Sequence, residues 1–327
     1  MRNWPGVSVV MPILNEERHL RAAVSGVLDQ HYPGDLELIM AIGPCTDRTH
    51  EIAESLVAED PRLRIVDNPV GRTPRALNLA IEAARHDILV RVDGHGELGE
   101  RYIERAVELL EETGAANVGG VMQARGQTIF EEAVAYIYTS RYGLGGAAFH
   151  QGNVPAGPAD TVFLGVFDKT ALTAVGGFDE TLHRAQDWEL NYRLRQSGRV
   201  VWFSPELRVT YRPRSSLKAL VKQMYDTGKW RREVVRRHRD TASVRYLAPP
   251  AAVAAIGIGS VGALVGTVTG SRLLKLGVTA PLGYAAFVAY VTATAPRTLS
   301  PQARRWLPAV LAATHLSWGA GFLVGRR

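Results

Sequence analysis

An aspartate and a histidine, Asp93 and His95, directly follow a short apolar run. The run from Asp87 to Val92 is bounded by turn-forming residues, which is typical of a buried strand. Side chains two residues apart at the end of a strand can point into the same crevice, and open α/β sheets bind ligands at that end. An acidic group beside a second ligand side chain there suits a divalent metal that holds a diphosphate.

The elements that must position these two side chains alternate between strands and helices. Apolar residues recur at helical spacing between short apolar runs at 7–11, 36–42, 64–66 and 87–92. An aspartate-bearing helix start follows further on, from Ala185 to Glu189. The alternation predicts an α/β fold with a mostly parallel sheet flanked by helices.

The chain changes character near residue 245. Charged residues make up 21% of its 327 residues, yet three stretches contain none: 247–270, 276–296 and 306–325. Each meets the roughly 20 residues that a helix needs to cross a bilayer core. Their many glycines and alanines suit close packing of helices in lipid. We therefore expect residues 246–327 to form a transmembrane region with three helices.

A basic segment, residues 216–245, precedes the three stretches. Its apolar stripe lies among lysines, which is typical of a helix on a membrane surface, and consists of Leu217, Leu220, Val221 and Met224. The arginines of this segment are Arg231, Arg232, Arg236, Arg237, Arg239 and Arg245. Basic residues beside a membrane span meet anionic lipid head groups. The net charge of +6 therefore calls for no nucleic-acid partner, and the sequence shows no zinc-finger or RNA-binding signature.

Basic residues also predict the orientation of the chain in the membrane. With the N-terminal part inside, the inner flanks of the three stretches carry more arginines and lysines than the outer flanks. The outer flanks then hold Arg272, Lys275, Arg326 and Arg327. The apolar run near the N-terminus is too short for a signal peptide. We therefore expect a multi-pass protein of the cell (inner) membrane with a cytoplasmic N-terminal domain and its C-terminus outside.

In their order and spacing, the motifs of this chain resemble those of glycosyltransferase family 2 over nearly its whole length. They are Val7–Glu16, Thr46–Thr49, Ala76–Asn78, Val92–His95, Gly176–Glu180 and Asp187–Arg195. The likeness is greatest to membrane-bound members that extend bacterial exopolysaccharides of the succinoglycan kind. The resemblance implies a GT-A fold, a nucleotide-sugar donor (most often a UDP-sugar), a divalent metal, Mn²⁺ or Mg²⁺, and inversion at the anomeric carbon.

The resemblance places several residues at the nucleotide. Pro12, Asn15 and Glu16 would line its pocket where the first strand meets its helix; the alternative is a simple capped helix start. Asp47 matches the family's aspartate near the nucleoside, and could equally be an N-cap. The chain departs from the family pattern at Ile42, where an acidic residue is usual.

The phosphates and the metal have candidate ligands of their own. Arg72 and Arg75 flank a helix start, a combination that favours a phosphate, unless both are simply solvated. Asp93 would bind the metal, with His95 where the family usually has a second aspartate. An imidazole suits Mn²⁺ better than Mg²⁺. His95 could instead bind a donor phosphate directly.

Asp187 is the proposed general base, which would take the proton of an acceptor hydroxyl as it attacks the anomeric carbon. The alternative is a helix cap. Gln186 stands where many relatives have an acidic residue, and Glu189 is a possible helper. Trp188 could form a platform for a sugar ring or belong to the core.

These expectations combine into one organisation and one reaction. Residues 1–215 would form a cytoplasmic glycosyltransferase domain, 216–245 an interfacial helix and 246–327 the membrane region. The enzyme would transfer a sugar to a hydroxyl of a lipid-linked or membrane-associated glycan. Two alternatives remain: a polyprenyl-phosphate glycosyltransferase, whose acceptor needs no strong base, and a non-catalytic membrane scaffold. His315, within the third apolar stretch, could bind substrate, relay a proton or make a helix contact.

Overall fold

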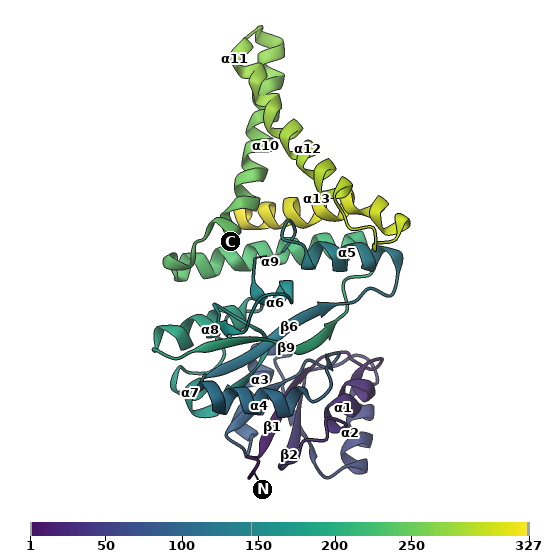
Figure 1. The fold of residues 1–327 in the computed structure, drawn as a ribbon, viewed down its shortest axis with the longest axis vertical. Helices are drawn as coiled ribbons and strands as arrows, with labels where there is room; N and C mark the ends of the chain where they lie inside the picture. The colour runs from purple at the N-terminus through teal and green to yellow at the C-terminus, as the bar shows by residue number, and fades with distance from the viewer. Residues whose placement is uncertain (1, 145, 326–327) are drawn as a thin grey trace. The chain divides into compact units, whose positions relative to one another are not determined.

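The computed structural model describes residues 2–144 and 146–325, and Figure 1 shows its fold with many of the helices and strands labelled. The chain divides into two compact units. The sheet unit consists of Met1–Gln123 and Ala147–Tyr211, and the helical unit of Ala124–Gly146 and Arg212–Arg327.

The division differs from the expected sequence boundaries at one place. The sequence predicts a continuous domain over 1–215, and the sheet unit ends at Tyr211. The internal segment Ala124–Gly146, however, belongs to the helical unit. It contains α5 (Ile129–Thr139), which packs against the last helix of the chain. The apolar residues of α5 thus find their partner far away in sequence.

The described residues of the sheet unit form a nine-stranded sheet in the order β3-β2-β1-β4-β8-β6-β9-β5, with β7 paired to β9. Strands β3, β2, β1 and β4 are parallel, whereas β8 runs antiparallel to both β4 and β6. The strands are β1 (Val7–Ile13), β2 (Leu36–Ile42), β3 (Leu63–Asp67), β4 (Ile88–Arg91), β5 (Glu97–Leu98), β6 (Asn117–Ala124), β7 (Gly157–Pro158), β8 (Phe163–Asp168) and β9 (Val201–Tyr211).

Helices cover both faces of this sheet, which explains why its parallel strands are almost continuously apolar. Val9 and Met11 of β1 belong to one hydrophobic cluster and Val10 to the other, because successive side chains of a strand face opposite sides. The first cluster includes α1 (Leu20–Leu28), α2 (Thr49–Glu59) and α4 (Tyr102–Thr113). The second includes α3 (Thr73–Ala83), α7 (Lys169–Ala174) and α8 (Gln186–Gln196); the short α6 spans Ala148–Gln151. The predicted α/β fold is confirmed.

The parallel strands bring two of the predicted motifs to one edge of the sheet. β1 and β4 are neighbours, with Val10 beside Arg91 in the register. The loops that follow them therefore begin at the same edge, which places the residues after Ile13 next to those after Arg91.

The helical unit consists of long helices (Figure 1). Three of them, among the described residues, are long and apolar enough to cross a membrane: α10 (Val244–Thr269), the stretch Arg272–Ala293, and α13 (Pro301–Val324). The stretch Arg272–Ala293 is built from α11 (Arg272–Lys275), η2 (Leu276–Val278) and α12 (Thr279–Ala293). The basic helix is α9 (Leu217–Arg237), followed by η1 (Arg239–Thr241). Arg326 and Arg327, used above to predict orientation, lie outside the described residues.

Candidate active site

The loop after β1 is held by the loop that precedes α2. Asn15 adopts a left-handed conformation with φ 56°, and its Oδ1 accepts a hydrogen bond from the Thr46 backbone N–H at 2.8 Å. The backbone N–H of Glu16 donates to Thr49 Oγ1 at 2.8 Å. Pro12, the remaining predicted residue, lies within β1 beside Ala41 of β2. Hydrogen bonds between the two loops thus fix the first predicted motif to the second.

Asp47 is the residue that orders this junction. Its carboxylate accepts the Thr49 hydroxyl at 2.6 Å, the Thr49 backbone N–H at 3.1 Å and the Glu17 backbone N–H at 3.2 Å. The hydrogen bond from the Thr49 side chain, followed by those from the backbone, holds the pKa of Asp47 below its usual range. The N-cap residue of α2 is Arg48 and not Asp47, so these bonds tie the two loops together just before the helix; a contact of Asp47 with a nucleoside stays a prediction.

The two arginines at the start of α3 differ in their surroundings. Arg75 pairs with Glu180 at 3.1 Å, and Asn78 donates to the same Oε1 at 2.9 Å. Arg72 occupies the N-cap position of α3 and is exposed. Arg72 is therefore the more accessible of the two for an anion at this helix N-terminus.

The centre of the site is a buried guanidinium between two carboxylates. Arg91, the last residue of β4, is only 4% exposed. Its Nε donates to Asp93 Oδ1 at 3.1 Å, and its Nη1 donates to Asp187 Oδ1. The two aspartates that the sequence singled out, 94 residues apart, therefore lie on either side of one side chain. The sequence interpretation missed Arg91, although a charged residue inside an apolar strand was a visible signal.

Charge and burial act against each other in this cluster. Burial raises the pKa of the Asp187 carboxyl above its usual range; the nearby Asp93 carboxylate adds to the rise, and the Arg91 guanidinium opposes it. Burial disfavours the charge of Arg91, but Asp187 and Asp93 together hold its pKa above the usual value. The result is a permanently charged Arg91 and an Asp187 that is more basic than an exposed aspartate.

Asp187 stands in the first turn of α8 and does not cap it. The N-cap residue is Ala185, in a left-handed conformation with φ 62°, and this helix start has no side-chain cap hydrogen bond. The capping alternative thus receives no support from the geometry. About a third of the Asp187 side chain is exposed, at 33%. It remains reachable for a substrate hydroxyl.

The neighbours of Asp187 on α8 are mostly buried. Gln186 is 8% exposed, and its Oε1 has no hydrogen-bond partner among the described residues. Trp188 is 6% exposed and stacks on Tyr192 with ring centroids 6.0 Å apart, as expected for a core residue. Glu189 is paired with Arg193 at 2.8 Å. The sugar-platform role of Trp188 and the helper role of Glu189 stay predictions that this packing does not favour.

His95 joins the two loops at the sheet edge. Its Nδ1 lies 2.8 Å from Glu16 Oε1, and nearly half of its side chain is exposed, at 48%. A Cβ on the intervening Gly94 would come within 3.1 Å of the Glu16 side chain, so the backbone approaches closely here. The loops after β1 and β4 are thus in direct contact with each other.

The side chains of these two loops supply only some of the ligands that a divalent cation needs. No group of three or more histidine, cysteine or acidic side chains suited to a metal occurs within residues 2–144 and 146–325. Asp93 offers Oδ2, since Arg91 engages Oδ1, and His95 offers an imidazole. A cation held by Asp93 and His95 would therefore take its further ligands from substrate and water, as Mg²⁺ and Mn²⁺ do at phosphate sites.

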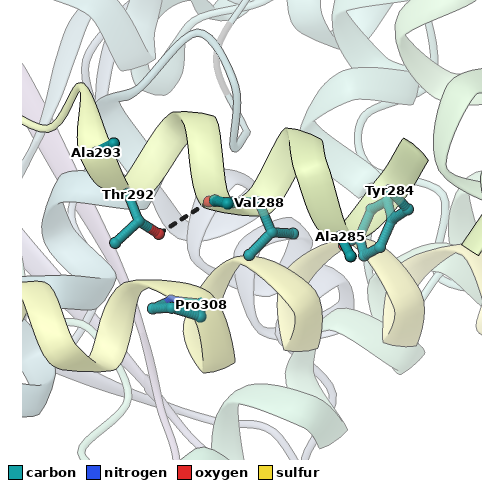
Figure 2. A pocket seen from close by; sticks show the side chains of 7 residues that line it. Tyr284, Ala285, Val288, Thr292, Ala293 and Pro308 are labelled. Carbon is teal, nitrogen blue, oxygen red and sulfur yellow. Dashed lines mark hydrogen bonds between the residues drawn. The ribbon is translucent and has the colours of Figure 1, made fainter. Parts of the chain in front are cut away.

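A separate apolar groove lies in the helical unit. Its volume is about 540 Å³, and it runs between α12 and α13 (Figure 2). The lining residues are Tyr284, Ala285, Val288, Ala289, Thr292, Ala293 and Pro308. The Thr292 hydroxyl already donates to the Val288 carbonyl at 2.9 Å. None of the predicted site residues lines this groove, and its lining carries no acid or base.

Comparison with known proteins now identifies the class. Residues 8–161 match the model of Glycosyl transferase family 2. The chain belongs to this family and is a glycosyltransferase with a GT-A fold. It is 33% identical over 318 residues to the succinoglycan biosynthesis protein ExoA of Rhizobium meliloti (strain 1021), with 96% of this chain and 93% of that protein covered.

More distant relatives agree with this class. The chain is 25% identical over 231 residues to a dolichyl N-acetyl-alpha-D-glucosaminyl phosphate 3-beta-D-2,3-diacetamido-2,3-dideoxy-beta-D-glucuronosyltransferase of Methanococcus voltae, covering 68% of this chain and 71% of that one. The mannosyltransferase PcManGT from Pyrobaculum calidifontis, solved with GDP-Man and Mn²⁺, superposes with a TM-score of 0.58 at 18% identity, over 95% of this chain and 86% of that chain. It shares the fold. The predicted family, fold and enzyme class are confirmed.

Proposed function

We propose that this enzyme transfers a sugar, with inversion, from a nucleotide-sugar to a hydroxyl of a lipid-linked glycan during synthesis of a cell-surface polysaccharide. The observation that carries the proposal is the Arg91 bridge between Asp93 and Asp187. It supports a single site in which one carboxylate faces the leaving group and the other the attacking hydroxyl. The nearly full-length similarity to a succinoglycan biosynthesis protein supports the polysaccharide product.

Asp187 is the proposed general base. An acceptor hydroxyl must lose its proton as its oxygen attacks the anomeric carbon, and a carboxylate within hydrogen-bond reach can accept it. Its raised pKa makes Asp187 a better proton acceptor than an exposed aspartate. Attack from the face opposite the nucleotide inverts the anomeric configuration in one displacement.

The donor side of the site is proposed to use Asp93, His95 and Arg72. Asp93 and His95 would hold Mn²⁺ or Mg²⁺, and such a cation stabilises the negative charge of a departing diphosphate. The Mn²⁺ in the structurally similar mannosyltransferase supports a metal at this fold. Arg72 would contact a phosphate at the N-terminus of α3. Pro12, Asn15, Glu16, Asp47 and Arg75 would line the nucleotide pocket, with uridine as the proposed base.

The acceptor is proposed to be lipid-linked because the catalytic fold is joined to apolar helices. Three of these, within the described residues, are long and apolar enough to enter a bilayer. A relative is named for transfer to a sugar carried on dolichyl phosphate. We propose the cell (inner) membrane as the location, with the catalytic domain, residues 1–215, on its cytoplasmic side.

The direct test supplies the purified full-length protein with labelled nucleotide-sugars, Mn²⁺ or Mg²⁺, and a membrane lipid extract. We expect label to enter the lipid phase from one donor. The Asp187→Asn variant should lose this transfer, whereas Asp35→Asn, the same change at a 78% exposed aspartate, should keep it. Undiminished transfer by Asp187→Asn would assign the enzyme to a phosphate acceptor, which needs no strong base. Failure to turn over any nucleotide-sugar would leave only the scaffold role.

A further inference from the structure

The last helix of the chain, α13, packs mainly along α9, which carries many charged residues. Within the helical unit α13 contacts α9 most extensively, contacts α10 and α5 less, and touches α12, and Figure 1 shows α13 running alongside α9. Within an 18-residue apolar segment of α13, 39% of the residues are buried inside the protein. The corresponding share is 6% in α10 and 6% in the stretch Arg272–Ala293. The three apolar helices are therefore not equivalent.

Glycines allow α9 and α13 to approach closely. A Cβ on Gly228 of α9 would lie 2.0 Å from the Trp318 carbonyl oxygen, and a Cβ on Gly321 of α13 would lie 2.0 Å from the Tyr225 carbonyl oxygen. The Arg232 guanidinium of α9 donates to the carbonyls of Phe322 and Leu323. The C-terminal end of α13 is thus fixed to the basic end of α9.

The other end and the middle of α13 are fixed to the internal segment 124–146. The hydroxyl and backbone N–H of Ser300, the N-cap of α13, donate to Glu132 of α5 at 2.7 and 3.0 Å. His315 Nε2 lies 2.8 Å from the Tyr142 carbonyl oxygen. These contacts correspond to the helix-contact alternative for His315. They tie α13 along its length to α5 and α9.

The composition of α9 places this layer outside the hydrocarbon core. Its charged residues are Lys218, Lys222, Asp226, Lys229, Arg231, Arg232, Glu233, Arg236 and Arg237. A helix with so many charges does not cross a bilayer, but it can lie at the interface with its basic side chains near lipid head groups. A helix that runs alongside α9 over its length follows the membrane surface with it and does not cross the bilayer.

The remaining two apolar segments have the opposite character. Between Leu247 and Gly270, α10 carries no charged residue, and its side chains are largely uncovered, such as Ile258 at 75% and Val268 at 81% exposed. α10 has 26 residues, so it is about 39 Å long, enough to cross the roughly 30 Å core. In Figure 1, α10 and α12 form a hairpin that leads away from the layer of α5, α9 and α13.

We infer that only the hairpin of α10 and Arg272–Ala293 crosses the membrane, and that α5, α9 and α13 form a layer on the membrane surface. The C-terminus then lies on the same side as the N-terminus, in contrast to the three crossings expected from hydropathy. Two crossings also improve the distribution of basic residues. Arg326 and Arg327 move to the arginine-rich side, and the far side keeps only Arg272 and Lys275.

Cysteine labelling tests this topology, because Cys45 is the single cysteine of the chain. In a Cys45→Ser background, one variant carries Asp35→Cys in the sheet unit and another carries Ser271→Cys between α10 and α11. A third carries a cysteine on a short flexible tail after Arg327. Each is treated with a membrane-impermeant maleimide before and after permeabilisation of the cells.

We expect the tail to label under the same condition as Asp35→Cys and under the opposite condition to Ser271→Cys. A tail that labels together with Ser271→Cys would show that α13 crosses the membrane and would overturn the inference. The comparison is internal to the chain, so it holds whichever side faces the cytoplasm. It also requires no activity, which keeps it independent of the proposed reaction.

Discussion

Replacing Arg91 by glutamine probes the central arrangement of the site. The side chain of glutamine can still donate a hydrogen bond but carries no charge, so Asp93 and Asp187 would face each other without a cation between them. Arg91 is 4% exposed, and breaking a buried ion pair by removing one partner typically costs about 3–5 kcal/mol. We therefore expect a clearly lower thermal midpoint for Arg91→Gln.

The same change should move the pH dependence of transfer. In the wild-type protein Arg91 opposes the rise in the Asp187 pKa caused by burial and by Asp93. Without Arg91 the pKa of Asp187 rises further, and an opposite charge at this range is typically worth about 1–3 pH units. The base is active when deprotonated, so the acidic limb of kcat/KM should shift to higher pH by about that amount.

The sign of the stability change follows from the same shift. A carboxyl whose pKa is raised by folding contributes stability below its unfolded pKa and loses it as pH rises through the folded value. The midpoint difference between Arg91→Gln and wild type should therefore grow as pH rises from acidic values, through the range in which Asp187 ionises. Thermal unfolding in detergent at several pH values measures this difference.

Arg62→Gln serves as the matched control. Arg62 pairs with Asp60 at 2.7 Å, but its side chain is 45% exposed, and exposed pairs contribute only about 0–1 kcal/mol. We expect this variant to keep both its thermal midpoint and its pH profile. If Arg91→Gln also kept the wild-type acidic limb, Asp187 would not be the titrating base, and the interpretation of the cluster would be refuted.

The remaining predictions concern the base, the metal and the helical layer. Asp187→Asn should lower kcat by about 10²–10⁴ with donor affinity unchanged; a loss of donor binding measured by calorimetry would contradict a role as base. Excess chelator should abolish transfer, and His95→Gln should raise the Mn²⁺ concentration needed to restore it; full transfer in chelator would exclude the metal. Gly228→Ala should lower the thermal midpoint because its Cβ meets the Trp318 backbone, whereas Gly283→Ala, with open space around it, should not; equal midpoints would contradict the close packing of α9 and α13.

The fold could be read from the sequence where local pattern and burial agree. The central parallel strands are buried on both faces, so their residues are mostly apolar, and the expected run at 36–42 coincides with β2 (Leu36–Ile42). The internal segment 124–146 could not be assigned in this way. Its membership of the helical unit depends on contacts between α5 and α13. In one of them, the ring centroids of Phe130 and Trp306 lie 5.2 Å apart. No local pattern encodes a partner so distant in sequence.

The number of membrane crossings is likewise not determined by the sequence pattern alone. Hydropathy counts α13 as a span because its composition suffices. What distinguishes α13 from α10 is the partner along its side, a charged helix that must stay at the interface. Composition describes a helix in isolation, whereas its depth in the membrane is decided jointly with the helices it packs against.

Part of the candidate site could likewise be predicted from the sequence and part could not. Motif spacing identified Asp93 and Asp187, and neighbouring parallel strands explain why Glu16 lies near His95. The arginine that joins the two aspartates was passed over: a charge within an apolar strand signals a buried polar contact, but the sequence does not say which residues make it. Arg91 can be buried only because both carboxylates accept its hydrogen bonds, and the two carboxylates can lie this close only because Arg91 is between them. Each of the three residues is thus explained by the other two, and this mutual dependence first becomes visible in three dimensions.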